Sequence, residues 1–256
     1  MSMTCVSGLA RHVALMLLAL APASVAIAQG FGVSPIRLDL DRTTRSASIT
    51  VNNDDDKPLG FQIRPKEWVQ DAEGKDQYLD TKDLIVFPLQ FQVPPGQSRI
   101  FRVGYRAPAG KNEQAYRVFI EDLPAPAPAS DGEHSSVVIS VQFGVPVFLR
   151  PPVIQQSAEL QQFGISKGGL TGVLRNTGSV HVRPTSVRVQ GLGDGGQKIF
   201  EHVFDGWYVL SGGTHKYSAP LAPEACRQTR TLAVEATGDK LALKSEFEVA
   251  AGSCAP

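Results

Sequence analysis

Three kinds of side chain in this 256-residue sequence could carry out catalysis or bind a metal ion: histidines, carboxylates and cysteines. The five histidines are scattered, and none stands three or four residues from another metal ligand in a frame typical of a site. The sequence also lacks a Gly-x-Ser-x-Gly elbow, a His-Glu-x-x-His motif and a glycine-rich phosphate loop. We therefore expect no catalytic centre, no cofactor and no metal.

Some carboxylates and one glycine-rich segment remain as candidates for chemistry. Asp39, Asp41 and Glu121 could pair for acid–base catalysis, but alternation of polar and apolar residues places them on a solvent face. The segment Gly191–Gly196 lacks the Lys-Ser/Thr pair and the following helix of a phosphate loop. It favours a hairpin loop.

The N-terminus has the pattern of a secretory signal peptide. Arg11 and His12 precede an apolar run from Val13 to Ala21, and residues 26–28 have the small-x-small form of a cleavage site. The alternative, a transmembrane anchor, requires a longer apolar run. We predict cleavage after Ala28 and no membrane-spanning segment in the remainder.

The cysteines agree with export. Cys5 would leave with the signal peptide, and Cys226 and Cys254 would remain. In an exported protein such a pair most simply forms one disulfide. The alternative, a two-thiolate metal site, lacks the close spacing and the nearby histidine that zinc and copper sites show.

The stretch Ser135–Arg150, SSVVISVQFGVPVFLR, alternates over most of its length. A period of two puts one set of apolar side chains on one face of an extended strand: Val137, Ile139, Val141, Phe143, Val145 and Val147. At about 3.3 Å per residue this strand would be roughly 50 Å long, two to three times the usual length. We expect its own domain not to cover it and the strand to pair with another protein. The alternative is an ordinary last strand of its own sandwich.

Two segments frame that strand. Glu121–Ser135 is rich in Pro, Ala and small polar residues, which predicts a mobile, extended loop. Arg150-Pro151-Pro152 ends the strand and marks a domain boundary, because two prolines cannot continue a ladder. Pro146 removes one backbone donor, which suits an edge strand.

Short strands separated by turns fill the rest of the chain, with no convincing amphipathic helix. Before the long strand we predict Ser34–Asp41, Ser46–Asn53, Leu59–Trp68, Leu84–Phe91, Ser98–Tyr105 and Ala115–Leu123. After it we predict Leu170–Asn176, Val180–Val189, Ile199–Leu210, Thr229–Ala236 and Leu241–Val249. This pattern indicates an all-β protein built of sandwiches.

The chain length predicts the number of domains, and the charge balance bears on the class of partner. The chain after the signal suits two immunoglobulin-sized domains of ~100 residues each. We predict a signal peptide at 1–28, an N-terminal domain at 29–150 and a C-terminal domain at 151–256. Lys+Arg and Asp+Glu balance at 25 each, so no strong field draws the protein to nucleic acid or to a membrane surface.

In its motifs the mature chain resembles the periplasmic pilus chaperones, the PapD-like partners of the chaperone–usher pathway. The matching segments cover essentially the whole mature chain, in order: VSPIRLDLD, SITVNND, LGFQIRPKEW, VPPGQSRIFRV, AYRVFIEDLP, VPVFLRPP, LRNTGSVHVRPTSVRV and GWYVLSGG. The sequence VPVF before the final LRP resembles the divergent branch often called archaic or alternative.

The resemblance implies two immunoglobulin-like sandwiches set at an angle with a cleft between them. Family members lend a strand to pilin subunits that lack their own last strand, and then pass them to an outer-membrane usher. Matched to the family, the lent side chains are Val137, Ile139, Val141 and Phe143. The implied location is the periplasm, and self-association of the unloaded chaperone is left open.

The resemblance also implies two basic residues that bind the pilin's C-terminal carboxylate. The first falls on Arg37, whose guanidinium fork suits a carboxylate. The second is usually a lysine, and in this chain Pro146 stands at its position. Arg102 is the first candidate for the missing charge, and Arg117 or another base on a neighbouring strand is the alternative.

Two other functional classes were weighed. A secreted β-sandwich pilus or adhesion subunit that receives a strand would be a single incomplete sandwich, whereas this chain predicts two. A periplasmic enzyme or metal carrier is disfavoured by the absence of clustered ligands in the sequence.

Overall fold

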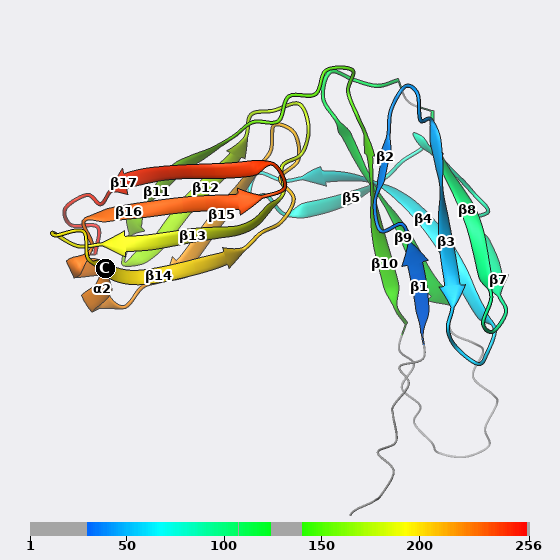
Figure 1. Cartoon of the computed structure of the whole chain (residues 1–256), viewed down its shortest axis with the longest axis horizontal. Helices are drawn as coiled ribbons and strands as arrows, with labels where there is room; N and C mark the ends of the chain where they lie inside the picture. The colour runs from blue at the N-terminus through cyan, green and yellow to red at the C-terminus, as the bar shows by residue number, and fades with distance from the viewer. Residues whose placement is uncertain (1–29, 107, 124–139, 255–256) are drawn as a thin grey trace, which may run out of the picture. The chain divides into compact units, whose positions relative to one another are not determined.

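The computed structural model describes residues 30–106, 108–123 and 140–254, and these residues form an almost entirely β structure (Figure 1). The strands fall into two sandwiches, the first made of β1–β10 and the second of β11–β17. The predicted signal peptide at 1–28 lies outside the described residues. No helix in the described part of the chain has the length and apolar character needed to cross a membrane.

The first sandwich packs two sheets face to face. Its strands are β1 Phe31–Ser34, β2 Leu38–Leu40, β3 Ser46–Asn53, β4 Leu59–Gln70, β5 Asp76–Asp80, β6 Leu84–Phe87, β7 Gln90–Val93, β8 Ser98–Tyr105, β9 Gln114–Leu123 and β10 Gln142–Leu149. One sheet has the order β1-β3-β8-β6, and the other has the order β2-β10-β9-β4-β5 with β7 also paired to β4. Alternate residues of each strand point inward, as in Ile49 and Val51 of β3, and form one buried apolar core.

Two predicted strands of this sandwich are each split by a proline. Of the stretch Ser34–Asp41, Ser34 ends β1, which pairs with β3, and Leu38–Leu40 forms β2, which pairs with β10 in the other sheet. The stretch Leu84–Phe91 forms β6, paired with β8, and the start of β7, paired with β4. Pro35 and Pro88 lie at the breaks, where the chain passes from one sheet to the other. A proline cannot donate to a ladder, so these are natural positions for it.

The second sandwich repeats the architecture. Its strands are β11 Ala158–Ser166, β12 Gly169–Asn176, β13 Pro184–Leu192, β14 Lys198–Asp205, β15 Thr214–Pro220, β16 Thr231–Gly238 and β17 Leu241–Glu248. The sheet orders are β11-β12-β15 and β14-β13-β16-β17. A separate core lies between them, so the predicted boundary at Arg150 and Pro151 falls between the last core residue of the first sandwich, Leu149, and the first of the second, Ala158.

A buried asparagine at the end of one strand ties each sandwich together. Asn53, at the end of β3, donates from Nδ2 to the carbonyl oxygens of Lys57 (2.7 Å) and Val93 (2.9 Å). Asn176, at the end of β12, donates in the same way to Val180 (2.8 Å) and Val209 (2.9 Å). Both side chains are buried with their donors satisfied, so Asn53 links its turn to β7 of the facing sheet and Asn176 links its turn to the segment between β14 and β15.

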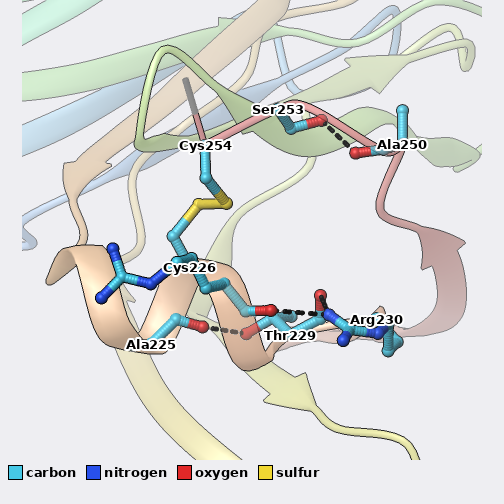
Figure 2. Close-up of a disulfide and its surroundings, with 8 residues drawn as sticks. Ala225, Cys226, Thr229, Arg230, Ala250, Ser253 and Cys254 are labelled. Carbon is cyan, nitrogen blue, oxygen red and sulfur yellow. Dashed lines mark hydrogen bonds between the residues drawn. A yellow bond between two sulfur atoms is a disulfide. The ribbon is translucent and has the colours of Figure 1, made fainter. Parts of the chain in front are cut away.

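The second half differs from its sequence-based prediction in one element type. The helix α2, Pro223–Gln228, was not expected, and Pro223 begins it in the first turn, where a missing N–H costs nothing. Cys226 on α2 is buried and forms a disulfide with Cys254 beyond β17, with the two Cα atoms 5.8 Å apart (Figure 2). The bond fixes the C-terminal segment against the helix.

Candidate functional site

The edge of β10 is the most unusual surface of the first sandwich. On one side β9 pairs with β10 along its whole length, from Gln142 to Leu149. On the other side, within the described residues, β2 pairs only with Val147–Leu149. Backbone groups of Gln142–Pro146 on that side therefore have no strand partner in the described part of the chain, which is the geometry that accepts an added strand.

The apolar face of β10 changes from buried to exposed along the strand. Val145, Val147 and Leu149 are buried in the core of the first sandwich. Toward the N-terminal end, Phe143 is 39% exposed and Val141 is 44% exposed. The alternation predicted from the sequence is thus present, and the solvent-accessible part of the row lies along the open edge.

The predicted lent side chains have different surroundings. Phe143 packs edge-on against Phe31 of β1, with ring centroids 5.3 Å apart, so it is partly held by its own sandwich. Val141 is held at its backbone, where its N–H donates to Asp122 Oδ1 (2.6 Å). Val137 and Ile139 lie outside the described residues, as does most of the predicted loop before them.

Arg37 lies just before β2, beside the paired end of β10. Its Nη2 donates to Asp39 Oδ1 (2.8 Å), and Arg150 Nη2 lies 3.1 Å from the same oxygen. Burial alone would raise the pKa of Asp39, but the hydrogen bond and charge of Arg37, aided by Arg150, outweigh it and hold the pKa below its usual value. Asp39 is therefore an ionised partner for both guanidiniums and no catalytic acid.

A hollow of about 360 Å³ opens beside Arg37. Residues of both sandwiches and of the segment between them line it, including Arg37, Arg150, Arg183 and Lys240. The guanidinium of Arg37 also lies over the ring of Phe148, 5.0 Å from its centroid. The hollow is thus rich in bases, and one of them, Arg37, rests on a buried aromatic ring.

A buried contact between Glu113 and His181 forms part of the wall of that hollow. Glu113 Oε1 lies 2.6 Å from His181 Nδ1 and accepts the backbone N–H of His181 at 3.0 Å. The His181 ring stacks on Phe148 with centroids 3.9 Å apart. This contact joins the first sandwich to the loop between β12 and β13, and no motif in the sequence predicts it.

The structure does not bring Arg102 to Arg37. Arg102 is on β8, in the sheet that does not contain β2 or β10, and its register partner is Phe87 of β6. It lines a different hollow, of about 290 Å³, with Arg45, Ile85 and Phe87. Alternation alone could not reveal this, because it identifies the face of a strand and not the sheet to which the strand belongs.

Arg117, the alternative base, lies beside Pro146, the position of the family's lysine, but its side chain is buried. It stands opposite Pro146 in the β9–β10 register and is only 9% exposed. Its guanidinium stacks over Trp68, 4.1 Å from the ring centroid, and also approaches the rings of Tyr78 and Trp207. Its Nε and Nη2 are buried without a hydrogen-bond partner in the described residues.

The carboxylates considered for catalysis lie in separate contacts. Asp39 binds Arg37 and Arg150, Asp41 caps the turn at Thr43 and Thr44, and Glu121 pairs with Arg64. Across the described residues, no group of three or more His, Cys, Asp or Glu side chains could hold a metal ion. The surface features that remain are an open strand edge, a basic hollow and exposed apolar side chains, all of which suit protein recognition.

Comparison with known proteins points the same way. The family model described as the PapD N-terminal domain of pili and flagellar-assembly chaperones matches residues 30–155. The chain is 29% identical over 126 residues to the probable fimbrial chaperone LpfB of Escherichia coli O157:H7, which is 49% of this chain and 51% of that protein. It thus spans about half the length of that curated relative.

Solved structures extend the likeness to both sandwiches. The chain matches a CsuC–CsuE chaperone–adhesin complex of the archaic Csu pili of Acinetobacter baumannii with a TM-score of 0.57 and 19% identity, covering 86% of this chain and 99% of that one. It matches a complex of the Salmonella enterica pilin SafA with the chaperone SafB with a TM-score of 0.55 and 14% identity, covering 87% and 97%.

At these identities the structural likeness shows the fold alone, so the assignment to the archaic or alternative branch stays a prediction. The fold is that of two immunoglobulin-like sandwiches, as the neighbours have it. The family match over residues 30–155 shows that the first sandwich is similar to the PapD N-terminal domain of pili and flagellar-assembly chaperones.

Proposed function

We propose that this protein is a periplasmic chaperone that binds, folds and caps pilin subunits by donor-strand complementation and delivers them to an outer-membrane usher. The single observation that carries the proposal is the open edge of β10, where the strand has no partner beside β9 before Val147 among the described residues and its apolar side chains become exposed from Val145 to Phe143 and Val141. Strand addition at such an edge is the established recognition mode of the family.

The physical basis is the completion of a sandwich. A pilin that lacks its last strand has a groove of unpaired backbone groups and uncovered apolar side chains, both of which β10 can supply. Val141 and Phe143 are about half accessible, so covering them contributes roughly 1 kcal/mol each. The backbone ladder adds affinity, and the alternate side chains fix the register.

The basic hollow fits the end of the bound subunit. We place the pilin's C-terminal carboxylate near Arg37, which lies beside the segment where β10 passes from its open edge to its paired end. Arg37 shares Asp39 with Arg150, so its guanidinium retains capacity for a second anion. This proposal needs no catalytic step, cofactor or metal.

The usher requires a second surface, because the pilin would cover β10. A candidate is the β6 patch, which we define as Ile85, Phe87, Leu89 and Ile100. All four side chains are exposed, with Phe87 at 76%, and β6 has no strand on its outer side among the described residues. Arg102 and Arg45 border the patch, so it suits an apolar partner with acidic residues.

The donor-strand role predicts a specific loss of binding. The double substitution Ile139→Asp, Val141→Asp puts two charges into the row that would enter the pilin groove, where burying them unpaired is unfavourable. We expect the pilin to stop co-purifying with the chaperone from the periplasm, while the circular dichroism spectrum and melting temperature of the chaperone stay unchanged.

The matched control is Val203→Asp, at a valine on β14 that is also about half exposed but lies in the second sandwich. It should leave pilin recovery at the level of the unsubstituted protein. Equal recovery with the double variant would show that β10 does not donate the strand.

A further inference from the structure

The charges that line the Arg37 hollow do not cancel. Its bases are Arg37, Arg150, Arg183 and Lys240, and its acids are Glu113 and Asp239. Asp39 adds a third acid by binding Arg37 and Arg150 together. Counting only the arginines, the lysine and the carboxylates, four bases face three acids and leave one positive charge, which matches a ligand that carries one negative charge.

The positively charged side chains of the hollow that have no ion-pair partner in the described residues both come from the second sandwich. Arg37 and Arg150 share Asp39, whereas Arg183 and Lys240 make no ion pair with any residue in the described ranges. Glu113 is already engaged by His181. The bases open to a bound anion are therefore Arg183, just before β13, and Lys240, in the turn between β16 and β17.

Aromatic rings hold Arg183 and Arg37 around one cluster. The Arg183 guanidinium lies 5.0 Å from the centroid of the Tyr208 ring, and that of Arg37 lies 5.0 Å from the centroid of Phe148. The two rings pack against each other with centroids 5.7 Å apart. Stacking fixes guanidinium planes and leaves their N–H edges free to donate to a carboxylate.

We propose that Arg183 is the second base of the carboxylate site, acting with Arg37 on the free C-terminus of the bound subunit. This inference rests on the proposed chaperone function and concerns the chemistry of its ligand. It differs from a pair of bases carried by one domain, since Arg37 comes from the first sandwich and Arg183 precedes β13 of the second. Pro146 then needs no charged replacement on its own strand.

The hollow also has an apolar wall. Ile154 lines it and is 55% exposed, beside the segment that joins the two sandwiches. A chain terminus that brings its carboxylate between Arg37 and Arg183 can place its last side chain on Ile154. The ligand class is therefore a polypeptide with a free carboxylate and an apolar C-terminal residue.

The test uses calorimetry on the full mature chain to measure how much a free C-terminal carboxylate contributes to the affinity for a peptide. The probes are two synthetic peptides of alternating valine and threonine that end in tyrosine, one with a free C-terminal carboxylate and one with a C-terminal amide. We expect the carboxylate peptide to bind the unsubstituted chain about tenfold or more tightly than the amide. Arg183→Ala and Arg37→Ala should each remove most of that difference, and Arg183→Lys should restore part of it.

Arg175→Ala is the matched control, because Arg175 is an exposed arginine on β12 outside the hollow. It should leave the preference for the carboxylate unchanged. Equal binding of the two peptides to the unsubstituted chain, or a full preference retained in Arg183→Ala, would overturn the inference while leaving strand donation intact. Binding of neither peptide, together with unchanged pilin recovery in the Ile139/Val141 variant, would instead count against the proposed function.

Discussion

Arg117 is the residue whose environment is most unusual for its type. A buried cation with two unpartnered nitrogen atoms is costly, and stacking on Trp68 offsets that cost by about 0.5–2 kcal/mol. The neighbouring residues on β10 make room for it: a Cβ added at Gly144 would lie 2.8 Å from Arg117 Cδ and 3.1 Å from Phe119 Cε1. Glycine at position 144 thus serves the packing of Arg117.

A second residue with a perturbed environment, His215 on β15, makes stability depend on pH. Burial lowers the pKa of His215, and the charge of Asp76 opposes this only in part. The unfolded chain takes up the proton near the ordinary value of about 6.5, so the neutral folded form is favoured above that pH and loses stability as the pH falls below it.

We therefore expect the urea midpoint of the protein to fall between about pH 6.5 and pH 5, and to fall less steeply in His215→Gln. His202→Gln, at a histidine on β14 of the same sandwich, serves as the control. Identical slopes for His215→Gln and the unsubstituted chain would show that His215 does not contribute to the acid loss.

Single residues were predicted unevenly. A short motif predicts the place of Arg37 just before β2, and its role as a carboxylate anchor stays a prediction, while Arg102 was assigned from its type and its position on a strand. The position of Arg183 could not be predicted, because its relation to Arg37 depends on the packing of Phe148 against Tyr208, residues 60 positions apart. A sequence motif predicts where a residue lies along its strand, whereas the contacts between residues far apart in the sequence depend on the three-dimensional fold.

At the scale of elements, β10 combines two roles in eight residues. Its last three residues lie between β2 and β9, which anchors the strand in its own sheet. Its first five pair on one side only in the described structure, which leaves main-chain groups for a partner. Anchoring one end and leaving the other open lets the strand keep its shape before a ligand arrives, which lowers the entropy cost of binding.

The β6 edge carries its own prediction. Phe87→Ser with Leu89→Ser removes the two apolar side chains that flank Pro88 without touching β10. If the β6 patch contacts the usher, periplasmic chaperone–pilin complexes should form at normal yield while surface pili, counted by electron microscopy, fall at least several-fold. Normal piliation in this variant would exclude the patch as the usher site.

Strands with clean alternation were the ones found from the sequence. Ser46–Asn53 and Ser98–Tyr105 have the predicted bounds because apolar residues recur at every second position, as at Ala47, Ile49 and Val51 and at Phe101, Val103 and Tyr105. β11 was missed, and its register shift between Gln161 and Gly164 interrupts the period. β5 and β15 are mostly polar edge strands, and α2 has only six residues, too few for a helical period to show.

At the scale of the whole molecule, two cores are joined by a small third cluster. Trp68, Ala115 and Phe148 of the first sandwich pack with Tyr208 of the second. Polar contacts support it, since Gln70 donates to the Tyr208 carbonyl oxygen (2.8 Å) and accepts from the Leu210 N–H (2.9 Å). Two rings of this cluster, Phe148 and Tyr208, also hold the guanidiniums of Arg37 and Arg183, the two bases of the proposed carboxylate site.

The disulfide stabilises the second sandwich as a unit. It closes a loop with a sequence separation of 28 residues, for which loop entropy predicts about 3–4 kcal/mol. We expect the Cys226→Ala, Cys254→Ser variant to lose a comparable part of its free energy of unfolding in urea. Reductant should lower the stability of the unsubstituted protein and not that of the variant. Two free thiols found by mass spectrometry in the untreated protein would contradict the pairing.

The stacking of Arg117 also has an optical consequence. The chain has two tryptophans, Trp68 in the first sandwich and Trp207 in the second, and the Arg117 guanidinium approaches both rings. The indole fluorescence of this protein therefore arises around a single cation where its two halves meet. Tryptophan emission of the unlabelled protein therefore reports on the surroundings of Arg117 and carries no signal from the rest of either sandwich core.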